Sequence, residues 1–314
     1  MKTIPIGKSG LSTTRLAYGC WRLAGVKNPA LVTPSHEEAG IKAVLAAFDA
    51  GYTLYDHADI YCNGAAETIF GKALKQAPSQ RSQILIATKC GIRWPGEPAP
   101  SSPHRYDFSA SHILNSCDQS LKRLGVETID LYQLHRPDYL MDPEEVASAF
   151  CQLKSAGKAR YFGVSNFHPS QVTALQSACP MPLIVNQVEI SLGKLNAFND
   201  GTLDQCLAQQ ITPLAWSPMT GGLLGTGAPA PQDHPRVGQI KDLQQTLDTI
   251  ARERSSTRAV IALAWLMKHP AKIVPIVGST NPGRIHEATQ ADNMDLSRDE
   301  WYRLLLAARG EKLA

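Results

Sequence analysis

Hydrophobic and polar positions alternate along this chain with two periods, one typical of strands and one typical of helices. Short apolar runs rich in β-branched residues predict strands. Eight such runs are spread over the sequence, at Leu16 to Gly19, Thr53 to Asp56, Ile84 to Thr88, Ile129 to Leu134, Arg160 to Val164, Leu183 to Asn186, Thr212 to Trp216 and Ile273 to Ile276. Amphipathic stretches predict helices between them, among others at residues 36–50, 109–125, 143–157, 240–254 and 257–268.

Two of these helices carry explicit end signals. Gly51 follows the first helix, and a glycine there can take the left-handed conformation that ends a helix. The helix near residue 143 has Asp142 as its N-cap and Pro143 in its first position, followed by two acidic residues.

The alternation of strands and helices predicts an α/β fold in which helices connect parallel strands. Two architectures satisfy this pattern, a doubly wound sheet and a closed (β/α)8 TIM barrel. We favour the barrel, because eight strand–helix units fill about 300 residues without a segment that looks like a linker. One domain over residues 1–314 is therefore expected. The opening segment KTIPIGKSGLSTTR predicts a small β-hairpin that caps one end of the barrel.

Two proline-rich segments predict loops that are too long for simple connections, residues 94–106 (WPGEPAPSSPHRY) and 226–236 (TGAPAPQDHPR). In a barrel, loops of this kind are typical of the catalytic mouth, where they can act as lids. For the second segment, plain disorder is an equally good interpretation.

Composition restricts the kinds of partner. The 314 residues are 43% hydrophobic and 19% charged, and the formal net charge of +3 is too small to indicate nucleic acid or a membrane surface. No stretch approaches the ~20 apolar residues that span a bilayer, and no signal peptide opens the chain. The seven cysteines form no CxxC pair, which favours free thiols in a reducing compartment. A cytoplasmic protein is expected, and a monomer is compatible with the sequence.

Ionisable residues gather at the predicted strand ends. In a TIM barrel the reaction site lies at the carboxyl ends of the strands, and these ends bring together Asp56, Tyr61, Lys89 and His135. Neighbouring strands are about 4.8 Å apart, so the four side chains can converge on one part of the rim. Each has a structural alternative, such as a helix cap for Asp56 or a solvated ammonium for Lys89. All four on one rim favour a catalytic site.

This group predicts proton donation by a phenol. A free tyrosine has a pKa near ~10 and rarely ionises at neutral pH. A lysine ammonium nearby favours the phenolate, and a carboxylate beside the lysine keeps that ammonium charged. Tyr61 could therefore give its proton to a carbonyl oxygen while a hydride arrives at the carbon, and His135 could orient the same oxygen.

The chain also resembles a known family. Seven segments follow the motif series of the aldo-keto reductase superfamily in its order: DHADIY, ATKCG, LHRPD, GVSNF, NQVEIS, AWSPMTGGLL and PIVGSTNPGRI. The resemblance runs from about residue 3 to residue 308. It implies a (β/α)8 barrel that binds NADPH without a Rossmann fold and reduces aldehydes and ketones. The family's catalytic tetrad falls on Asp56, Tyr61, Lys89 and His135, with Tyr61 as the general acid.

The same strand ends suggest how a nicotinamide cofactor would bind. Ser165, Asn166 and Gln187 offer hydroxyl and amide groups to the carboxamide, and Trp216 could stack on the ring where the family usually has tyrosine. The helix after the last strand presents free N–H groups that attract anions, and Arg284 in its first turn could pair with a 2′-phosphate. The further expected cofactor contacts are Gly19, Ser217, Gly222, Leu223, Gly278, Ser279, Thr280 and Glu287.

Two departures from the family pattern weaken the cofactor preference. Many relatives have lysine at the position of Gly278 and asparagine at the position of Ala288. NADPH is therefore expected, with NADH possible.

Other classes of site fit less well. A GxGxxG fingerprint after the first strand and a P-loop are both missing. A metal-dependent barrel hydrolase could use Asp56, His57, Asp59 and His135, but the sequence has no HxH pair, so no metal is expected. His57 is expected to pack or to face solvent.

Cys62 and Cys90 adjoin the tetrad, yet packing of a buried thiol is the simpler interpretation. A nucleotide-binding regulatory subunit of the same fold remains the alternative to an enzyme.

Substrate contacts should come from loops above the tetrad. The candidates are Trp21, Trp94, Tyr139, Leu140 and Met219. Their aromatic rings suggest a mostly apolar pocket for a small carbonyl compound. Only a short segment follows the last helix, so no long C-terminal flap is expected, and we predict a broad, loosely selective enzyme.

Overall fold

A computed structural model describes residues 1–230, 232–233 and 235–313 of the chain. Positions 231 and 234 belong to the predicted loop 226–236, so the prediction for this loop lies partly outside the described residues. In the rest of that segment the chain forms turns and irregular structure, and helix α7 begins directly after it at Val237.

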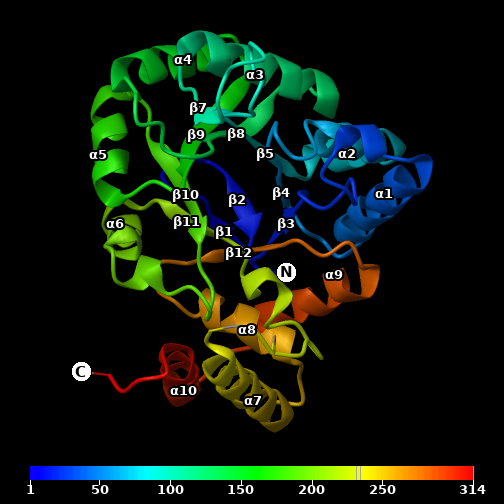
Figure 1. Cartoon of the computed structure of the whole chain (residues 1–314), viewed down its shortest axis with the longest axis vertical. Helices are drawn as coiled ribbons and strands as arrows, with labels where there is room; N and C mark the ends of the chain where they lie inside the picture. Colours follow the sequence, from blue (N-terminus) through cyan, green and yellow to red (C-terminus); the bar gives the residue numbers. More distant parts are fainter. Residues whose placement is uncertain (231, 234, 314) are drawn as a thin grey trace.

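Eight parallel strands close into a barrel (Figure 1). Around the barrel they follow the order β10, β11, β12, β3, β4, β5, β8 and β9. The barrel strands therefore follow one another as they do in the chain, and the last strand, β12, pairs with the first, β3. Their bounds are β3 (Ala17–Gly19), β4 (Leu54–Asp56), β5 (Leu85–Cys90), β8 (Ile129–Leu134), β9 (Ala159–Ser165), β10 (Leu183–Glu189), β11 (Thr212–Trp216) and β12 (Val274–Val277). All eight predicted strands are present, and the prediction of a (β/α)8 barrel is confirmed.

Helices surround the barrel and cover the outer face of its strands (Figure 1). The five helices predicted by range are α1 (Pro34–Asp49), α3 (Ala110–Leu124), α4 (Pro143–Ser155), α7 (Val237–Glu253) and α8 (Arg258–Met267). The others are α2 (Ala65–Gln76), α5 (Pro169–Ala178), α6 (Thr202–Gln209), α9 (Pro282–Thr289) and α10 (Arg298–Arg309). The end signals operate as predicted: Gly51 has a φ of +78° just past α1, and the Asp142 carboxylate accepts the N–H of Glu144 at 2.9 Å.

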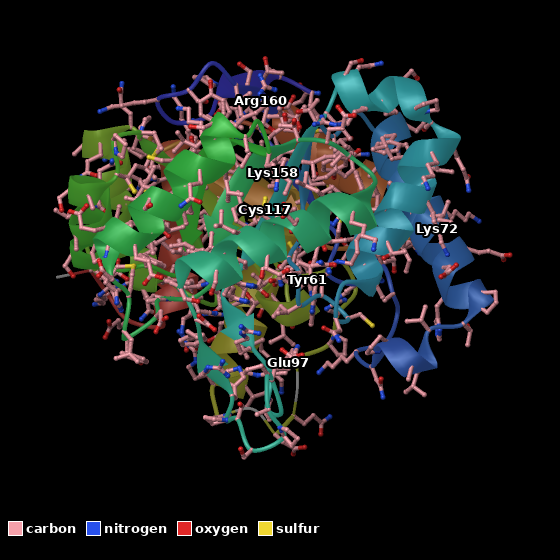
Figure 2. All side chains as sticks on the ribbon, turned by 90° about the horizontal axis from the view of Figure 1, so that it is seen from above. Tyr61, Lys72, Glu97, Cys117, Lys158 and Arg160 are labelled. Atoms are coloured by element: carbon pink, nitrogen blue, oxygen red, sulfur yellow. The ribbon has the colours of Figure 1, made fainter. Side chains whose placement is uncertain are left out.

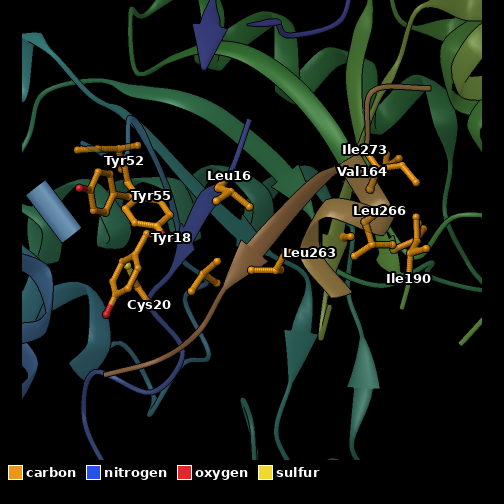
Figure 3. Close-up of a cluster of buried hydrophobic side chains, with 14 of the residues drawn as sticks. Leu16, Tyr18, Cys20, Tyr52, Tyr55, Val164, Ile190, Leu263, Leu266 and Ile273 are labelled. Atoms are coloured by element: carbon orange, nitrogen blue, oxygen red, sulfur yellow. The ribbon is translucent and has the colours of Figure 1, made fainter. Parts of the chain in front are cut away.

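Alternate residues of each strand enter two separate cores. One set fills the barrel interior and includes Leu54, Leu131 and Leu214. The other set packs between strands and helices, where Tyr18 and Tyr55 are fully buried (Figure 3). Because both faces of the strands are covered, the strand segments are almost continuously apolar, as parallel sheets require.

A hairpin closes one end of the barrel. Strands β1 (Thr3–Pro5) and β2 (Ser12–Thr14) pair antiparallel, and the buried Ile6 between them joins the interior core. Gly7 turns the chain there with a φ of +49°, and a Cβ atom at this position would collide with the backbone of Ile184. The predicted hairpin cap is therefore present at the end of the barrel where the strands begin.

The other end of the barrel is open to the long loops. Residues 94–106 were expected to form a loop throughout, and this is wrong at the end of the segment: β7 (Arg105–Tyr106) pairs antiparallel with β6 (Ile92–Arg93). The pairing is braced by Asp107, whose carboxylate accepts the Nε–H of Arg93 at 3.0 Å. Figure 2 shows Glu97, in this hairpin, projecting at the end of the molecule where Tyr61 lies and away from Arg160 at the start of β9.

Candidate functional site

The four residues predicted as a catalytic group come together at the open end of the barrel. The Lys89 ammonium, fully buried at the end of β5, lies 2.8 and 2.9 Å from the two carboxylate oxygens of Asp56. It also donates to the carbonyl oxygen of His57 at 2.7 Å and to the Tyr61 hydroxyl at 3.1 Å. The three N–H groups of the ammonium are thus fully engaged, which fixes its position under the phenol.

Tyr61 reaches this position because of a tight turn between β4 and α2. Cys62 and Asn63 both have a φ of +48°, and Gly64 then caps the helix in the left-handed conformation. The turn places the Tyr61 ring over the carboxyl ends of β4 and β5. Non-glycine residues rarely adopt positive φ, so two in succession mark a backbone that the surrounding structure holds in place.

Burial and the neighbouring charges shift the pKa values of Tyr61 and Lys89 in opposite directions. Burial raises the pKa of the Tyr61 phenol and the Lys89 charge and hydrogen bond lower it, and the resulting pKa is about 12. Burial also lowers the pKa of Lys89, but Asp56 and Tyr61 together outweigh this and raise it above its usual value. Lys89 therefore stays charged, and the phenol carries its proton at neutral pH.

His135 completes the group. Its ring stands edge-on to Tyr61, with the ring centroids 5.9 Å apart. Burial lowers the pKa of His135 well below its usual value, and the nearby charges of Lys89 and Arg136 lower it further. The imidazole is therefore neutral at physiological pH, with one nitrogen as donor and one as acceptor.

The three residues predicted to bind a carboxamide are linked to this group by hydrogen bonds. Gln187 donates through its side-chain Nε2 to the Asp56 carboxylate at 2.7 Å. The backbone carbonyl oxygen of Gln187 accepts a hydrogen bond from the Ser165 hydroxyl at 2.8 Å. Asn166, which has a φ of +63°, donates through Nδ2 to Ser165 at 2.8 Å and to the His135 carbonyl oxygen at 3.1 Å. These amides and the tetrad therefore form one connected network.

Trp216 extends the network across the mouth. Its indole Nε1–H donates to Asn166 Oδ1 at 2.9 Å, a contact that a phenyl ring could not make. The Arg136 guanidinium lies over the indole at 5.4 Å from the ring centroid. Sequence reasoning did not single out Arg136, although it directly follows His135 in LHRPD.

The loop after β11 is anchored by residues that the sequence did not reveal. Gln244 on α7 donates to the carbonyl oxygen of Leu223 at 2.7 Å, and Arg258 on α8 donates to that of Gly225 at 3.3 Å. Thr226 donates to the Glu287 carboxylate at 3.2 Å, which connects the loop to α9. Gln244 and Arg258 lie on helices that are distant from the loop in the sequence, so no sequence motif indicated that they contact it.

The start of α9 lies beside this loop. Asn281 caps the helix by accepting the backbone N–H of Arg284 at 3.2 Å, and Ser279 accepts the N–H of Asn281 at the same distance. The Arg284 side chain is exposed and makes no ion pair within the part of the chain that is described. Gly19 ends β3 and Gly278 directly follows the adjacent strand β12, so the backbone carries no side chain at either position.

The predicted cofactor contacts thus lie along one arc of the rim, from Ser165 through Trp216 to the N-terminus of α9. Amide and hydroxyl groups, an aromatic ring, a helix N-terminus and an exposed arginine are the groups that a phosphorylated nicotinamide dinucleotide needs. The residues present therefore fit such a cofactor.

The residues predicted to contact substrate differ in exposure. Trp21 and Trp94 are 51% and 43% exposed, whereas Tyr139 and Leu140 are 94% and 90% exposed and form no wall of a pocket in this conformation. Met219 packs partly against the outer core.

Other candidates from the sequence have structural explanations. His57 is fully buried against Phe70, with ring centroids 4.5 Å apart, which settles that it packs. Among the described residues, no three His, Cys, Asp or Glu side chains assemble as a possible metal site. Cys62 and Cys90 are buried free thiols whose pKa values are raised by burial.

Known proteins share the sequence pattern and the fold of this chain. The model of the Aldo/keto reductase family matches residues 15–305. A 6-dehydroglucose reductase of Novosphingobium aromaticivorans is 40% identical over 314 residues, covering 98% of this chain and 96% of the relative. A 6-dehydroglucose reductase of Agrobacterium fabrum is 39% identical over 305 residues, covering 97% of each chain. The structure of a glycerol dehydrogenase of Gluconobacter oxydans superposes with a TM-score of 0.85 at 26% identity, covering 99% of this chain and 97% of the other.

Proposed function

Because the chain belongs to the aldo/keto reductase family, we propose that it reduces aldehydes and ketones to alcohols with NADPH, and that Tyr61 is the general acid. The family assignment makes the protein an oxidoreductase that uses a nicotinamide cofactor. The single observation that carries the mechanistic proposal is the 3.1 Å contact between the Lys89 ammonium and the Tyr61 hydroxyl.

The reduced nicotinamide, when bound, supplies a hydride from its C4 atom. The residues of the chain then have four tasks. Tyr61 donates its proton to the carbonyl oxygen, and the Lys89 ammonium stabilises the phenolate that this leaves behind. Asp56 keeps Lys89 charged in a buried site, where an unpaired ammonium would lose its proton. Neutral His135 can donate one hydrogen bond to the same carbonyl oxygen and so orient it.

The preference for NADPH over NADH is proposed on the exposed Arg284 guanidinium. It lies in the first turn of α9, where the positive end of the helix dipole also favours an anion. Ser165, Asn166 and Gln187 would hold the carboxamide, and Trp216 would cover one face of the nicotinamide ring. The loop from Ser217 to Leu223, with Gly19, Gly278, Ser279, Thr280 and Glu287, would surround the rest of the cofactor.

For the substrate we propose an aldehyde that carries hydroxyl groups. Two relatives that cover almost the whole chain are named 6-dehydroglucose reductases, which supports a sugar aldehyde as the first compound to assay. The mouth contains Arg136 and Arg22 beside indole rings, and each guanidinium lies over its indole at 5.4 and 5.6 Å. Guanidinium donors and flat aromatic faces suit a polyhydroxylated molecule better than the apolar pocket that the sequence suggested.

A cytoplasmic location is part of the proposal. It is supported by the cysteines, all seven of which are free. Within the described residues, the helices are too short or too polar for any of them to cross a membrane.

The experiment that tests the proposed reaction uses Tyr61→Phe. The purified variant should lose at least about 100-fold in kcat for an aldehyde, because phenylalanine has no hydroxyl proton to give to the carbonyl oxygen. Its dissociation constant for NADPH, measured by fluorescence titration, should stay within twofold. Tyr302→Phe, which removes the hydroxyl of a partly buried tyrosine on α10, serves as the control and should behave as wild type. A Tyr61→Phe protein with near-normal turnover would refute the assignment. Wild-type protein that binds NADPH but reduces no carbonyl compound would favour a regulatory subunit.

A further inference from the structure

Strand β8 places a polar side chain, Gln133, inside the barrel. Gln133 is fully buried, and neither its amide nitrogen nor its amide oxygen has a hydrogen-bond partner within the described residues. Its neighbours Tyr132 and Leu134 belong to the outer core, whereas Leu131 belongs to the interior core. Strand alternation therefore directs Gln133 into the barrel. A buried amide that makes no hydrogen bond costs about 1–3 kcal/mol, so this position calls for a partner.

Gln133 lies next to the candidate catalytic group. It is in register with Lys89 on the neighbouring strand. His135 follows two residues later, and its backbone N–H continues the strand ladder to Cys90 at 2.9 Å. Side chains two residues apart on a strand point to the same face, with Cα atoms about 7 Å apart. Gln133 and His135 are therefore stacked on the inward face of β8, with His135 nearer to the mouth.

The two nitrogens of the His135 ring are in different surroundings. Nδ1 is enclosed and has no partner among the described residues. Nε2 also makes no hydrogen bond within that part of the chain, but it is not enclosed, so it is the nitrogen that faces the mouth. For His135 to donate a hydrogen bond to a substrate oxygen, the hydrogen must be on Nε2. A neutral imidazole then has a bare acceptor at Nδ1, which needs a donor from the protein.

We infer that Gln133 is a positioning residue whose Nε2 donates a hydrogen bond to His135 Nδ1, directly or through one water molecule, and so holds the ring in the Nε2–H tautomer. This role rests on the proposed function, in which His135 donates to the carbonyl oxygen. Within the described residues, the Gln133 amide is a buried donor without a hydrogen-bond partner, and it lies two residues from His135 on the same strand face. The charged groups around the ring, Lys89 and Arg136, are both cations, so neither can accept a hydrogen bond from Nδ1 and favour the other tautomer.

The direct test is the tautomer of His135 in the cofactor-free protein. Histidine labelled with 15N at both ring positions reports by NMR which nitrogen carries the hydrogen, and His135→Asn identifies the signals. Wild type should show the Nε2–H form. Gln133→Glu keeps the size and shape of the side chain but offers an acceptor, so it should reverse the tautomer to Nδ1–H. Gln133→Met offers neither a donor nor an acceptor to Nδ1 and should give a mixture of the two tautomers. The same tautomer in all three proteins would overturn the inference.

Kinetics provide a second readout. Gln133→Met should lower kcat for aldehyde reduction about tenfold, the loss expected for one hydrogen bond of about 1.4 kcal/mol, with NADPH affinity unchanged. Gln176→Met on α5 is the matched control, since it removes a partly buried glutamine far from the mouth, and its kcat should equal that of wild type. An unchanged kcat in Gln133→Met would also contradict the inference.

The two proposals fail in different ways. If wild type reduces no carbonyl compound, the proposed function is wrong, but the NMR experiment still decides whether Gln133 sets the tautomer. If wild type is an active reductase and the Gln133 variants leave the tautomer unchanged, only the positioning role is wrong.

Discussion

The ammonium of Lys89 lies 3.1 Å from the hydroxyl of Tyr61, inside a barrel end where Lys89 is fully buried and Tyr61 is partly buried. The contact joins a residue at the end of β5 to one in the turn before α2, 28 positions apart in the chain. It matters because burial alone would make the phenol a poor acid, and only the adjacent charge lowers its pKa.

Replacing Lys89 by Met should show this effect in the pH profile. The Lys89 charge lowers the Tyr61 pKa from what burial would otherwise give, so its removal should raise that pKa further. In alcohol oxidation the phenolate accepts the proton, and the rate rises as the pH approaches the pKa from below. The rise of kcat/KM for oxidation with NADP+ should therefore move to higher pH, and reduction should slow by at least about 100-fold. Lys72→Met on the surface of α2 is the control, and an unshifted profile in Lys89→Met would contradict the mechanism.

Arg284→Ala should separate the two nicotinamide cofactors. If the guanidinium pairs with the 2′-phosphate, its loss should raise the KM for NADPH by about tenfold or more, the value of one charge-assisted hydrogen bond, and leave the KM for NADH unchanged. Steady-state kinetics with both cofactors measure this. Arg298→Ala, an exposed arginine at the start of α10, should change neither KM. Equal effects on both cofactors would show that Arg284 does not recognise the phosphate.

His57 should make the protein sensitive to mild acid. Burial, with a contribution from Lys89, lowers the His57 pKa from 6.5 to about 3, so the folded protein keeps the ring neutral while the unfolded chain takes up a proton. The stability that His57 contributes is complete above pH 6.5 and is lost as the pH falls towards 3, by about 1.4 kcal/mol per pH unit. His57→Leu should therefore lose less thermal stability than wild type between neutral and mildly acidic pH. A pH dependence of thermal stability in His57→Leu equal to that of wild type would contradict this prediction.

Gly7→Ala should loosen the hairpin that closes the barrel. The new Cβ atom would meet the backbone of Ile184, and the φ of +49° is itself unfavourable for alanine. A loss of about 3 kcal/mol in the free energy of unfolding is expected, measured by denaturant titration. Gly96→Ala is the matched control, because Gly96 also has a positive φ of +86° but has open space around it. Its loss should be only about 1–2 kcal/mol. Equal losses in the two variants would mean that the contact with Ile184 is unimportant.

The fold could be predicted well because each strand and helix is specified locally. Strands buried on both faces are short apolar runs, and amphipathic helices separate them, so the order of elements implied parallel strands. The number of strand–helix units and the absence of a linker then favoured the barrel over a doubly wound sheet. Prediction failed where pairing is not local. Arg105 and Tyr106 follow a proline-rich loop and form a strand only because Ile92 and Arg93 lie opposite.

The candidate site could be predicted as a set of residues but not as a network. Residues at strand ends meet because barrel closure brings the ends together, which is why the tetrad was accessible from sequence. Arg136, Gln244 and Arg258 were missed, since they act across the mouth or from distant helices and have no distinctive spacing in the chain.

The sequence by itself determined the order of strands and helices, the barrel and the identity of four converging side chains, because these follow from local periodicity and from the geometry of parallel strands. Only the tertiary structure decided which of those groups are charged and which nitrogen of His135 faces the mouth. Protonation and hydrogen-bond direction depend on burial and on neighbours from other strands, such as Gln187 beside Asp56 and Gln133 beneath His135.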